Sequence, residues 1–346
     1  MNVLVTGGAG YVGSHTVREL LSRKHGVVVV DNLSQGHAQA LPAGIPLIVG
    51  NVWDEGLLTR AVHKYGINAI IHFAADELFK DTNKKPTNYF NSNVAGMLAV
   101  LDAMQSCGIH RIVLSSTTAI YGDSGNISVT EETPLVPSTI YGRTKFVVER
   151  MLSERSQVHP YSYVVLRYFN AAGASLDGMI GEDHSPEIHL LPLIMKSIFG
   201  ENEAVEIFGT DYLTLDGTYI RDYIHVVDVA NAHVRAVEYL GVGGASRVYN
   251  LGTGTGYSVG EVIDRVKGLT GLHVPVKESS RKDGAPAILL PSFQGIREEL
   301  GWVSQYSDLD TIVSTAWQWH KSHPRGYERR KVLGKSIHSS SIVQSI

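Results

Sequence analysis

The sequence has 346 residues and a single cysteine, Cys107, so no disulfide can form within the chain. No apolar run approaches the roughly 20 residues needed to cross a bilayer. No charged and apolar leader precedes the first strand pattern. We therefore expect a cytoplasmic protein that does not span or contact a membrane.

The chain also lacks a large excess of charge of either sign. Lysine and arginine total 30, aspartate and glutamate 34, and the formal net charge is −4. Without a basic face, nucleic acid is not an expected partner. The 15 histidines are scattered, with no His/Cys/Asp spacing typical of a metal site, so we expect no metal. The remaining composition, 43% hydrophobic, is that of a globular enzyme with one large or two joined domains.

The first half of the chain alternates short β-branched runs with longer helical patterns, which is typical of βαβ units. This rhythm predicts an α/β fold with a doubly wound parallel sheet of the Rossmann type, in a first domain over residues 1–170. The expected strands are Asn2–Thr6, Val27–Asp31, Leu47–Val49, Ala69–Phe73, Arg111–Ser115 and Tyr163–Tyr168. The expected helices are Tyr11–Ser22, Glu55–Lys64, Pro86–Cys107 and Tyr141–Ser153.

Beyond residue 170 the rhythm changes, because loops lengthen and glycine and proline become more frequent. Here we expect a smaller α/β C-terminal substrate domain over residues 171–325, with some later segments returning to the first domain. Residues 326–346 are polar and aperiodic, which predicts a mobile tail. The helical patterns in this half, which we assign no paired strands, are Leu190–Phe199, Val227–Leu240 and Val259–Leu269.

A glycine-rich segment, VLVTGGAGYVGSH, joins the first strand to the first helix. Gly7, Gly10 and Gly13 would permit a tight turn and bring bare backbone amides to a pyrophosphate at the helix N-terminus. Asp31 ends the second strand about 20 residues later, where its carboxylate can accept hydrogen bonds from a ribose. Because that carboxylate repels a 2′-phosphate, the pattern favours NAD over NADP. A second cluster, YNLGTGTGYSV at 249–259, is interpreted as a substrate-domain turn that follows the completed sheet.

Tyr141 and Lys145 in YGRTK share one helical face, where an ammonium can stabilise a phenolate and make tyrosine a usable base. The spacing alone is weak, since Tyr327 and Lys331 repeat it without plausible chemistry. Thr117 lies at the carboxyl end of the fifth strand, where ligands of such sheets bind. We therefore expect Tyr141, Lys145 and Thr117 to be catalytic, with the threonine hydroxyl bonded to the reacting oxygen.

Longer motifs occur in a fixed order: TGGAGYVGSH, DNLSQG, HFAA, YGDSG, YGRTK, LRYFNAAGA, GEDH, HLLPLI, FGTDYLTLDGTYIRDYIHVVDVA and YNLGTG. In identity and separation they resemble the UDP-glucose 4-epimerase family of extended short-chain dehydrogenases/reductases. The resemblance covers residues 1–325, and IRDYIHVVDVA and RYFN are more specific than the glycine loop. It implies a Rossmann-type domain, permanently held NAD, a UDP-hexose inverted at C4 through a 4-keto sugar, and commonly a homodimer.

The resemblance also implies roles for single residues, carried over position by position. For NAD binding it implies Gly7, Gly10, Tyr11, Val12, Asp31, Asn32, Asn51, Val52, Phe73, Ala74, Asn93, Ser115, Tyr141, Lys145 and Tyr168. For the sugar and nucleotide it implies Thr117, Asn170, His189, Leu190, Phe208, Arg221, Tyr223 and Arg281. The two arginines suit a diphosphate, because a guanidinium offers a fork of fixed donors.

The chain departs from the family pattern near the cofactor. After HFAA, Asp76 and Glu77 stand where the family usually has a lysine, and Lys80 lies nearby. Asn51 replaces an aspartate and keeps an acceptor oxygen, while Thr117 replaces a serine and keeps the hydroxyl.

A second group of departures concerns the sugar. Near Arg281 the usual Gly-Asp becomes Asp283-Gly284, and a bulky aromatic becomes Ile288. The sugar of the substrate therefore stays open between UDP-glucose or UDP-galactose, UDP-N-acetylglucosamine and UDP-glucuronate.

Two rival functions share this fold. A nucleotide-sugar dehydratase or decarboxylase would usually carry acidic residues directly after the threonine, where this chain has Thr118 and Ala119. An NAD-sensing regulator with an impaired site would be consistent with Asp76 and Glu77. The intact catalytic residues Thr117, Tyr141 and Lys145 argue against a regulator.

Overall fold

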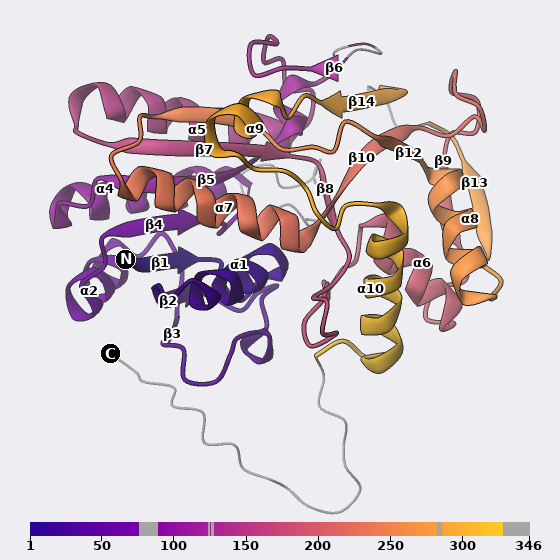
Figure 1. The fold of residues 1–346 in the computed structure, drawn as a ribbon, viewed down its shortest axis with the longest axis horizontal. Coiled ribbons are helices and arrows are strands. Elements are labelled where there is room, and N and C mark those ends of the chain that lie inside the picture. The colour runs from indigo at the N-terminus through magenta and orange to yellow at the C-terminus, as the bar shows by residue number, and fades with distance from the viewer. Residues whose placement is uncertain (76–88, 124, 126–127, 282–285, 328–346) are drawn as a thin grey trace, which may run out of the picture.

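The computed structural model describes residues 1–75, 89–123, 125, 128–281 and 286–327. Its centre is a seven-stranded parallel sheet with the order β11-β7-β5-β4-β1-β2-β3 (Figure 1). The predicted doubly wound sheet is therefore confirmed. The strands are β1 (Asn2–Thr6), β2 (Gly26–Asp31), β3 (Leu47–Val49), β4 (Ala69–His72), β5 (Arg111–Thr117), β7 (Ser162–Tyr168) and β11 (Arg247–Asn250).

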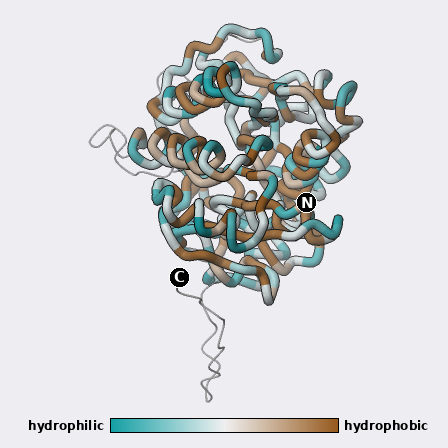
Figure 2. The backbone as a smooth tube through the Cα atoms, turned by 90° about the vertical axis from the view of Figure 1, so that its left-hand side faces the viewer, coloured by the Kyte–Doolittle hydropathy of each residue, from teal (hydrophilic) through white to brown (hydrophobic). Residues whose placement is uncertain are grey.

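Helices cover both faces of this sheet, because successive strand residues point to opposite sides. Val3 and Val5 of β1 pack in one core cluster and Leu4 packs in the other. The first cluster includes side chains of α1 (Tyr11–Ser22), α7 (Val226–Gly241) and α9 (Gln294–Leu300). The second includes side chains of α2 (Glu55–Tyr65), α4 (Gly96–Cys107) and α5 (Ile140–Val158). In Figure 2 most helices carry both colours, as expected for elements with one apolar face.

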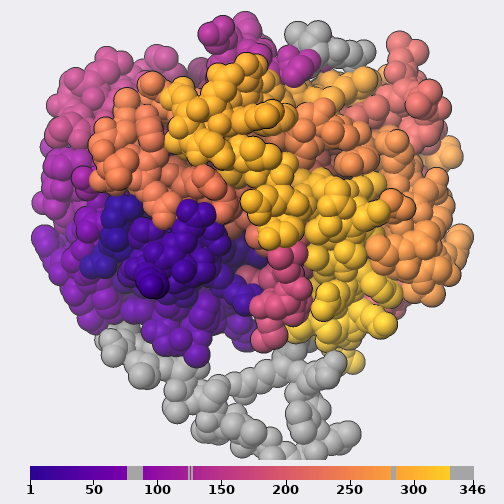
Figure 3. Space-filling model, viewed as in Figure 1, coloured from indigo at the N-terminus to yellow at the C-terminus, as the bar shows by residue number. Residues whose placement is uncertain are grey.

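The late chain returns to the first domain in three elements. Strand β11 pairs with β7, so YNLGTGTG begins within the seventh strand of the main sheet and does not come after a completed sheet as we expected. Helix α7, which we expected in the substrate domain, packs against α1 and the main sheet. Trp302, fully buried beyond α9, completes that layer. Figure 3 shows orange and yellow late segments lying against the indigo and violet first domain.

The second domain is α/β as predicted, but it contains strands that we did not assign to its helices. A five-stranded sheet runs β12-β10-β14-β6 with β8 beside β10, and β9 pairs with β13. These strands were missed because most are only two to four residues long. They are β6 (Ser128–Val129), β8 (Asn170–Ala172), β9 (Val205–Phe208), β10 (Ile220–His225), β12 (Gly256–Ser258), β13 (Val276–Ser279) and β14 (Ile288–Pro291).

Helices α6 (Leu190–Ile198), α8 (Val259–Thr270) and α10 (Leu309–Ser322) pack with β9 and β10 into a separate core. Short helical turns are η1 (Ala38–Ala40) and η3 (Thr118–Tyr121), and the π-helix η2 (Phe90–Ala95) precedes α4. Within the described ranges, no helix combines the length and apolar character that a bilayer crossing requires.

Several sequence predictions fall outside the described residues: those for Asp76, Glu77, Lys80, Asp283, Gly284 and Lys331, and those for 86–88 and 328–346. Tyr327 is described, and it is anchored. Its hydroxyl accepts the Gly181 N–H at 3.0 Å, and its own N–H donates to Asp183 at 2.9 Å. Tyr327, which we expected in a mobile tail, is thus held against the segment of residues 181–183.

Candidate active site

The glycine loop between β1 and α1 brings backbone close to a cleft at the carboxyl end of the sheet. Gly7 has φ +69°, and a side chain there would meet the backbone of Ala74 at 2.6 Å. A side chain on Gly13 would overlap the carbonyl of Gly7. Gly10 is the N-cap of α1 and offers no side-chain cap, so the first-turn amides keep their donors for a ligand. This backbone can hold a pyrophosphate.

Asp31 ends β2 beside that loop. Its carboxylate accepts the N–H of Ala9 at 2.9 Å and that of Leu33 at 2.8 Å, which fixes its orientation. Burial raises the pKa of Asp31, and the two amides oppose that rise. The neighbouring Asn32 donates to the Asn51 side chain at 3.0 Å. A fixed, acceptor-only group here suits two ribose hydroxyls and disfavours a phosphate.

The predicted catalytic pair lies on the opposite wall of the cleft, at the first turns of α5. Thr139 caps this helix by accepting the Gly142 N–H at 3.0 Å. Lys145 is 4% exposed, and its Nζ donates to the Ser115 carbonyl at 3.1 Å. The same Nζ lies 5.9 Å from the centre of the Tyr141 ring. The spacing in YGRTK therefore places an ammonium beside the phenol, as predicted.

The end of β5 supplies the polar groups that face this pair. The Ser115 hydroxyl and the Tyr168 hydroxyl are 2.7 Å apart. Thr117 is 7% exposed, and its hydroxyl accepts the Ala119 N–H at 3.1 Å. Thirteen of the residues predicted to bind NAD line this one cleft, together with Thr117 and His189: Gly7, Gly10, Tyr11, Val12, Asp31, Asn32, Val52, Phe73, Ala74, Ser115, Tyr141, Lys145 and Tyr168.

Two predicted NAD residues do not line the cleft. Asn51 accepts the hydrogen bond from Asn32 described above, and Asn32 lines the cleft. Asn93 in η2 is 2% exposed and donates to the Thr144 hydroxyl on α5 at 3.0 Å. Both therefore contact residues around the cleft.

A second cleft adjoins the first on the side of the smaller domain. Of the predicted substrate residues it is lined by Asn170, His189, Leu190, Phe208, Arg221 and Tyr223. Phe169, Ala171, Glu182 and His189 line both clefts. A molecule spanning the shared wall would place one end near Tyr141 and the other among the aromatic residues of the second cleft.

Arg221 on β10 is the cation of this second cleft. Its guanidinium lies 4.7 Å from the Tyr219 ring centre and 5.9 Å from that of Phe169, and it donates to the Ile220 carbonyl at 2.8 Å. No carboxylate of the described residues lies within ion-pair distance of it. Burial lowers the pKa of Arg221 from its usual value, but a guanidinium stays protonated. A half-buried cation with no carboxylate beside it among the described residues is suited to an anionic ligand.

Arg281, the other predicted diphosphate residue, lies outside the lining of both clefts. It forms an ion pair with Asp211 at 2.6 Å and stacks over Tyr212, with 4.1 Å to the ring centre. Tyr212 lines the second cleft, so Arg281 contacts a lining residue of that cleft without lining it itself.

Sequence reasoning missed several lining residues. Tyr212 and Tyr219 belong to the quoted motif FGTDYLTLDGTYIRDY and yet received no role. Tyr219, Arg221 and Tyr223 alternate at period two, so one face of an extended segment could have been recognised. Glu182 and His184, which line the first cleft, were missed too.

Glu182 and His184 also belong to a side-chain cluster that contrasts with the expected absence of a metal. One potential ligand atom from each of Glu182, His184, Glu187 and His189 lies within 4.8 Å of the others. Its sequence spacing, Glu-x-His-x-x-Glu-x-His, includes two glutamates and so differs from the His/Cys/Asp spacings on which the prediction of no metal rests.

Residues 3–252 match the model of the NAD dependent epimerase/dehydratase family. The chain therefore belongs to that family. It is 46% identical over 327 residues to the UDP-glucose 4-epimerase of Halalkalibacterium halodurans, covering 94% of this chain and 98% of the relative. A crystal structure of a UDP-glucose 4-epimerase superposes with TM-score 0.92 at 43% identity, covering 95% of this chain and all of that one. The Bifidobacterium longum UDP-glucose 4-epimerase in complex with NAD+ and UDP gives TM-score 0.89 at 34% identity, with 94% and 100% coverage.

Proposed function

We propose that this protein is a UDP-glucose 4-epimerase that inverts C4 of a UDP-hexose through a 4-keto sugar and interconverts UDP-glucose and UDP-galactose. The observation that carries the proposal is the shared wall of the two clefts. On one side of this wall is the first cleft, lined by Tyr141, Lys145, Thr117 and a loop suited to NAD, and on the other side is the aromatic cleft that contains Arg221. One dinucleotide and one nucleotide sugar could therefore meet at this wall.

The residues of the first cleft fit NAD by their own chemistry. The loop has no side chains where a pyrophosphate would approach, and Asp31 offers only acceptors. NAD bound there would supply a nicotinamide that accepts hydride from C4 of the sugar and returns it. Asp31 would meet the adenosine ribose, with Asn32 beside it.

Tyr141 would take the proton of the sugar 4-hydroxyl, and the nearby ammonium of Lys145 would favour its phenolate. Thr117 would donate a hydrogen bond to the reacting oxygen. After the flat 4-keto sugar turns its other face, Tyr141 would return the proton and hydride would return to C4, so the configuration is inverted. No group is consumed in the cycle.

Arg221 would hold the diphosphate while the hexose turns. The aromatic side chains of Phe208, Tyr219 and Tyr223 give the second cleft stacking and apolar surface for a nucleoside. His189 and Asn170 would contribute polar contacts where the clefts join. For the hexose to turn within the site, the nucleotide must stay bound and the sugar must make few contacts.

The dehydratase alternative is disfavoured by the residues that follow Thr117. Thr118 is fully buried and Ala119 is apolar, so neither can serve as the acid or base of an elimination. Among the described residues that line the first cleft, the carboxylates are Asp31 and Glu182. The first is bonded to backbone amides and the second to His189, so both are committed elsewhere.

We also propose that the protein works in the cytoplasm as a homodimer. A lone cysteine favours a reducing compartment. Analytical ultracentrifugation would test the dimer.

The function is tested by incubating purified protein with UDP-galactose, without added NAD, and following UDP-glucose by ion-exchange chromatography. We expect conversion to equilibrium by NAD that copurifies. Absence of conversion, with bound NAD confirmed after denaturation, would favour the regulator instead. UDP-N-acetylglucosamine and UDP-glucuronate in parallel reactions would establish which sugar is preferred.

A further inference from the structure

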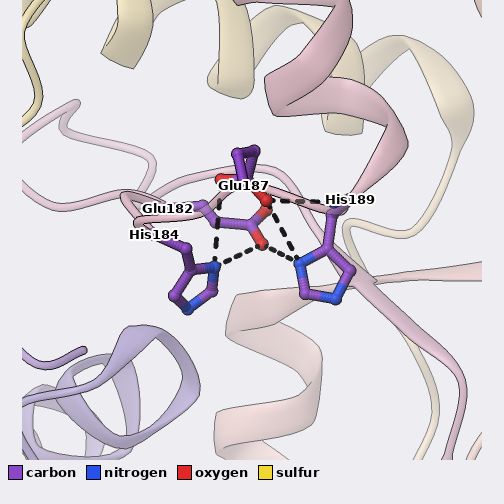
Figure 4. Close-up of side chains that lie close together, drawn as sticks. All are labelled: Glu182, His184, Glu187 and His189. Atoms are coloured by element: carbon purple, nitrogen blue, oxygen red, sulfur yellow. Dashed lines mark hydrogen bonds and ion pairs between the residues drawn. The ribbon is translucent and has the colours of Figure 1, made fainter. Parts of the chain in front are cut away.

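The segment between β8 and α6 holds four ionisable side chains against one another. Figure 4 shows both imidazole rings turning Nδ1 toward the carboxylates of Glu182 and Glu187. The side chains are 4% exposed for Glu182, 3% for Glu187, 12% for His184 and 31% for His189. Two carboxylates so deeply buried need compensating positive charge.

The polar atoms of this Glu/His cluster, defined as Glu182, His184, Glu187 and His189, are unevenly satisfied. Glu182 Oε1 lies 2.6 Å from His189 Nδ1 and 3.3 Å from His184 Nδ1. Glu187 Oε1 accepts the N–H groups of Ile188 and His189 at 2.8 and 2.9 Å. Glu187 Oε2 and His184 Nδ1 are buried and have no aligned hydrogen-bond partner among the described residues. They face each other at 3.9 Å.

We propose that the Glu/His cluster binds a divalent cation of the zinc class. His184 Nδ1 and Glu187 Oε2 are 3.9 Å apart, so a small approach of the two side chains would bring both within zinc–nitrogen and zinc–oxygen bond lengths of about 2.0–2.2 Å. A tetrahedral ion with such bonds has ligands separated by roughly 3.3–3.5 Å. The His–Glu separations in the cluster are 2.6, 3.3, 3.6 and 3.9 Å, and one potential ligand atom from each of the four side chains lies within 4.8 Å of the others.

The donor set selects the class of ion. Two imidazole nitrogens with two carboxylate oxygens suit Zn²⁺, whereas Mg²⁺ and Ca²⁺ prefer oxygen ligands alone. Two carboxylates would neutralise a divalent charge. Glu187 is already oriented by two backbone amides, as ligating carboxylates commonly are. Binding would require Glu182 to exchange its contact with His189 for the ion, and the four side chains to move closer together.

An ion at this location would affect the wall that the two clefts share. Glu182 and His189 line both clefts, and His184 lines the first. An ion would tie this wall to the start of α6 and fix the imidazole of His189. It would hold the wall between cofactor and substrate in one conformation, whether or not the chain is an epimerase.

Zinc alone is the probe for the test. Tag-free full-length holoenzyme is treated with EDTA, dialysed and equilibrated with micromolar ZnCl₂, and bound zinc is measured by atomic absorption. Cobalt(II) in a parallel sample reports geometry, because a tetrahedral centre absorbs strongly in the visible range. We expect one equivalent of zinc per chain and a tetrahedral cobalt spectrum.

The variants are His184→Gln and Glu187→Gln, which keep approximate size, with His25→Gln as matched control. His25 pairs with a single carboxylate, Glu238, at 3.1 Å. We expect at least tenfold weaker binding in both cluster variants and unchanged binding in the control, with circular dichroism verifying the fold. Wild-type protein that retains no zinc, or binding that survives both substitutions, overturns the proposal and leaves an imidazolium–carboxylate network.

Discussion

Arg221→Met tests whether the second cleft is an anion site. The guanidinium lies between aromatic rings without a carboxylate in ion-pair distance among the described residues, so its charge is uncompensated in the ligand-free protein. Removing it should weaken binding of UDP. The same change should not lower the free energy of unfolding, because a half-buried cation without a carboxylate partner costs desolvation energy. The affinity for UDP should therefore decrease while the free energy of unfolding does not.

The expected loss follows from the bonds that the guanidinium can make. A hydrogen bond to a charged group contributes about 1.5–3 kcal/mol, and each 1.4 kcal/mol is a factor of ten in affinity. Losing one such bond to a phosphate therefore costs roughly 10- to 150-fold in the dissociation constant of UDP. Arg221→Lys keeps the charge and loses the planar fork, so its loss should lie at the lower end of that range.

Isothermal titration of UDP into the holoenzyme measures the loss, and urea unfolding measures stability. Arg247→Met is the matched control, since Arg247 is a surface residue paired with Glu299 at 2.7 Å. The control should bind UDP as the wild type does. An Arg221→Met protein with wild-type affinity for UDP would refute the assignment of the second cleft, and one that bound weakly because it had unfolded would refute the energetic argument.

Three further predictions follow from other parts of the molecule. The Tyr141→Phe variant should keep its NAD and lose activity by about 10²- to 10⁴-fold. The control is Tyr327→Phe, because Tyr327 is the other tyrosine four residues before a lysine, and this variant should retain activity. Comparable turnover in the two variants would contradict the assignment of Tyr141 as the base. Burial lowers the pKa of buried histidines, to about 3 for His72 and His225 and to about 4 for His15, His233 and His320. Their pKa in the unfolded chain is about 6.5, so on acidification the unfolded state takes up protons before the folded state does. The urea concentration at the unfolding midpoint should therefore decrease as the pH is lowered from 6.5 to 4. A midpoint that stays constant over this pH range would contradict the prediction. A fragment of residues 1–170 lacks β11 and α7, so it should show neither a cooperative thermal transition nor NAD binding, and finding both would contradict the shared core.

Much of the first domain could be predicted from the sequence, because its signals are local. The valine run before Asp31 reads as a buried parallel strand, and the glycine loop marks the turn into α1. Tyr141 and Lys145 could be paired because helical spacing fixes which side chains are neighbours. Six of the seven strands of the main sheet were predicted in this way.

What could not be predicted depends on contacts between distant segments. Strand β11 reads RVYN, too short and too polar to be recognised apart from its partner β7. That the Arg221 guanidinium has no carboxylate within ion-pair distance among the described residues depends on its surroundings in space. The Glu/His cluster requires the chain to fold back on itself over residues 182–189, which spacing alone does not establish.

The position of β11 at the outer side of β7 has a consequence during synthesis. Until residues 247–250 have left the ribosome and folded, the hydrogen-bonding groups along that side of β7 have no strand to pair with. An open strand edge is a template for pairing with other chains. The nascent polypeptide must therefore carry an aggregation-prone strand edge while the segment between β7 and β11 is synthesised, and chaperone dependence should be greatest in that interval.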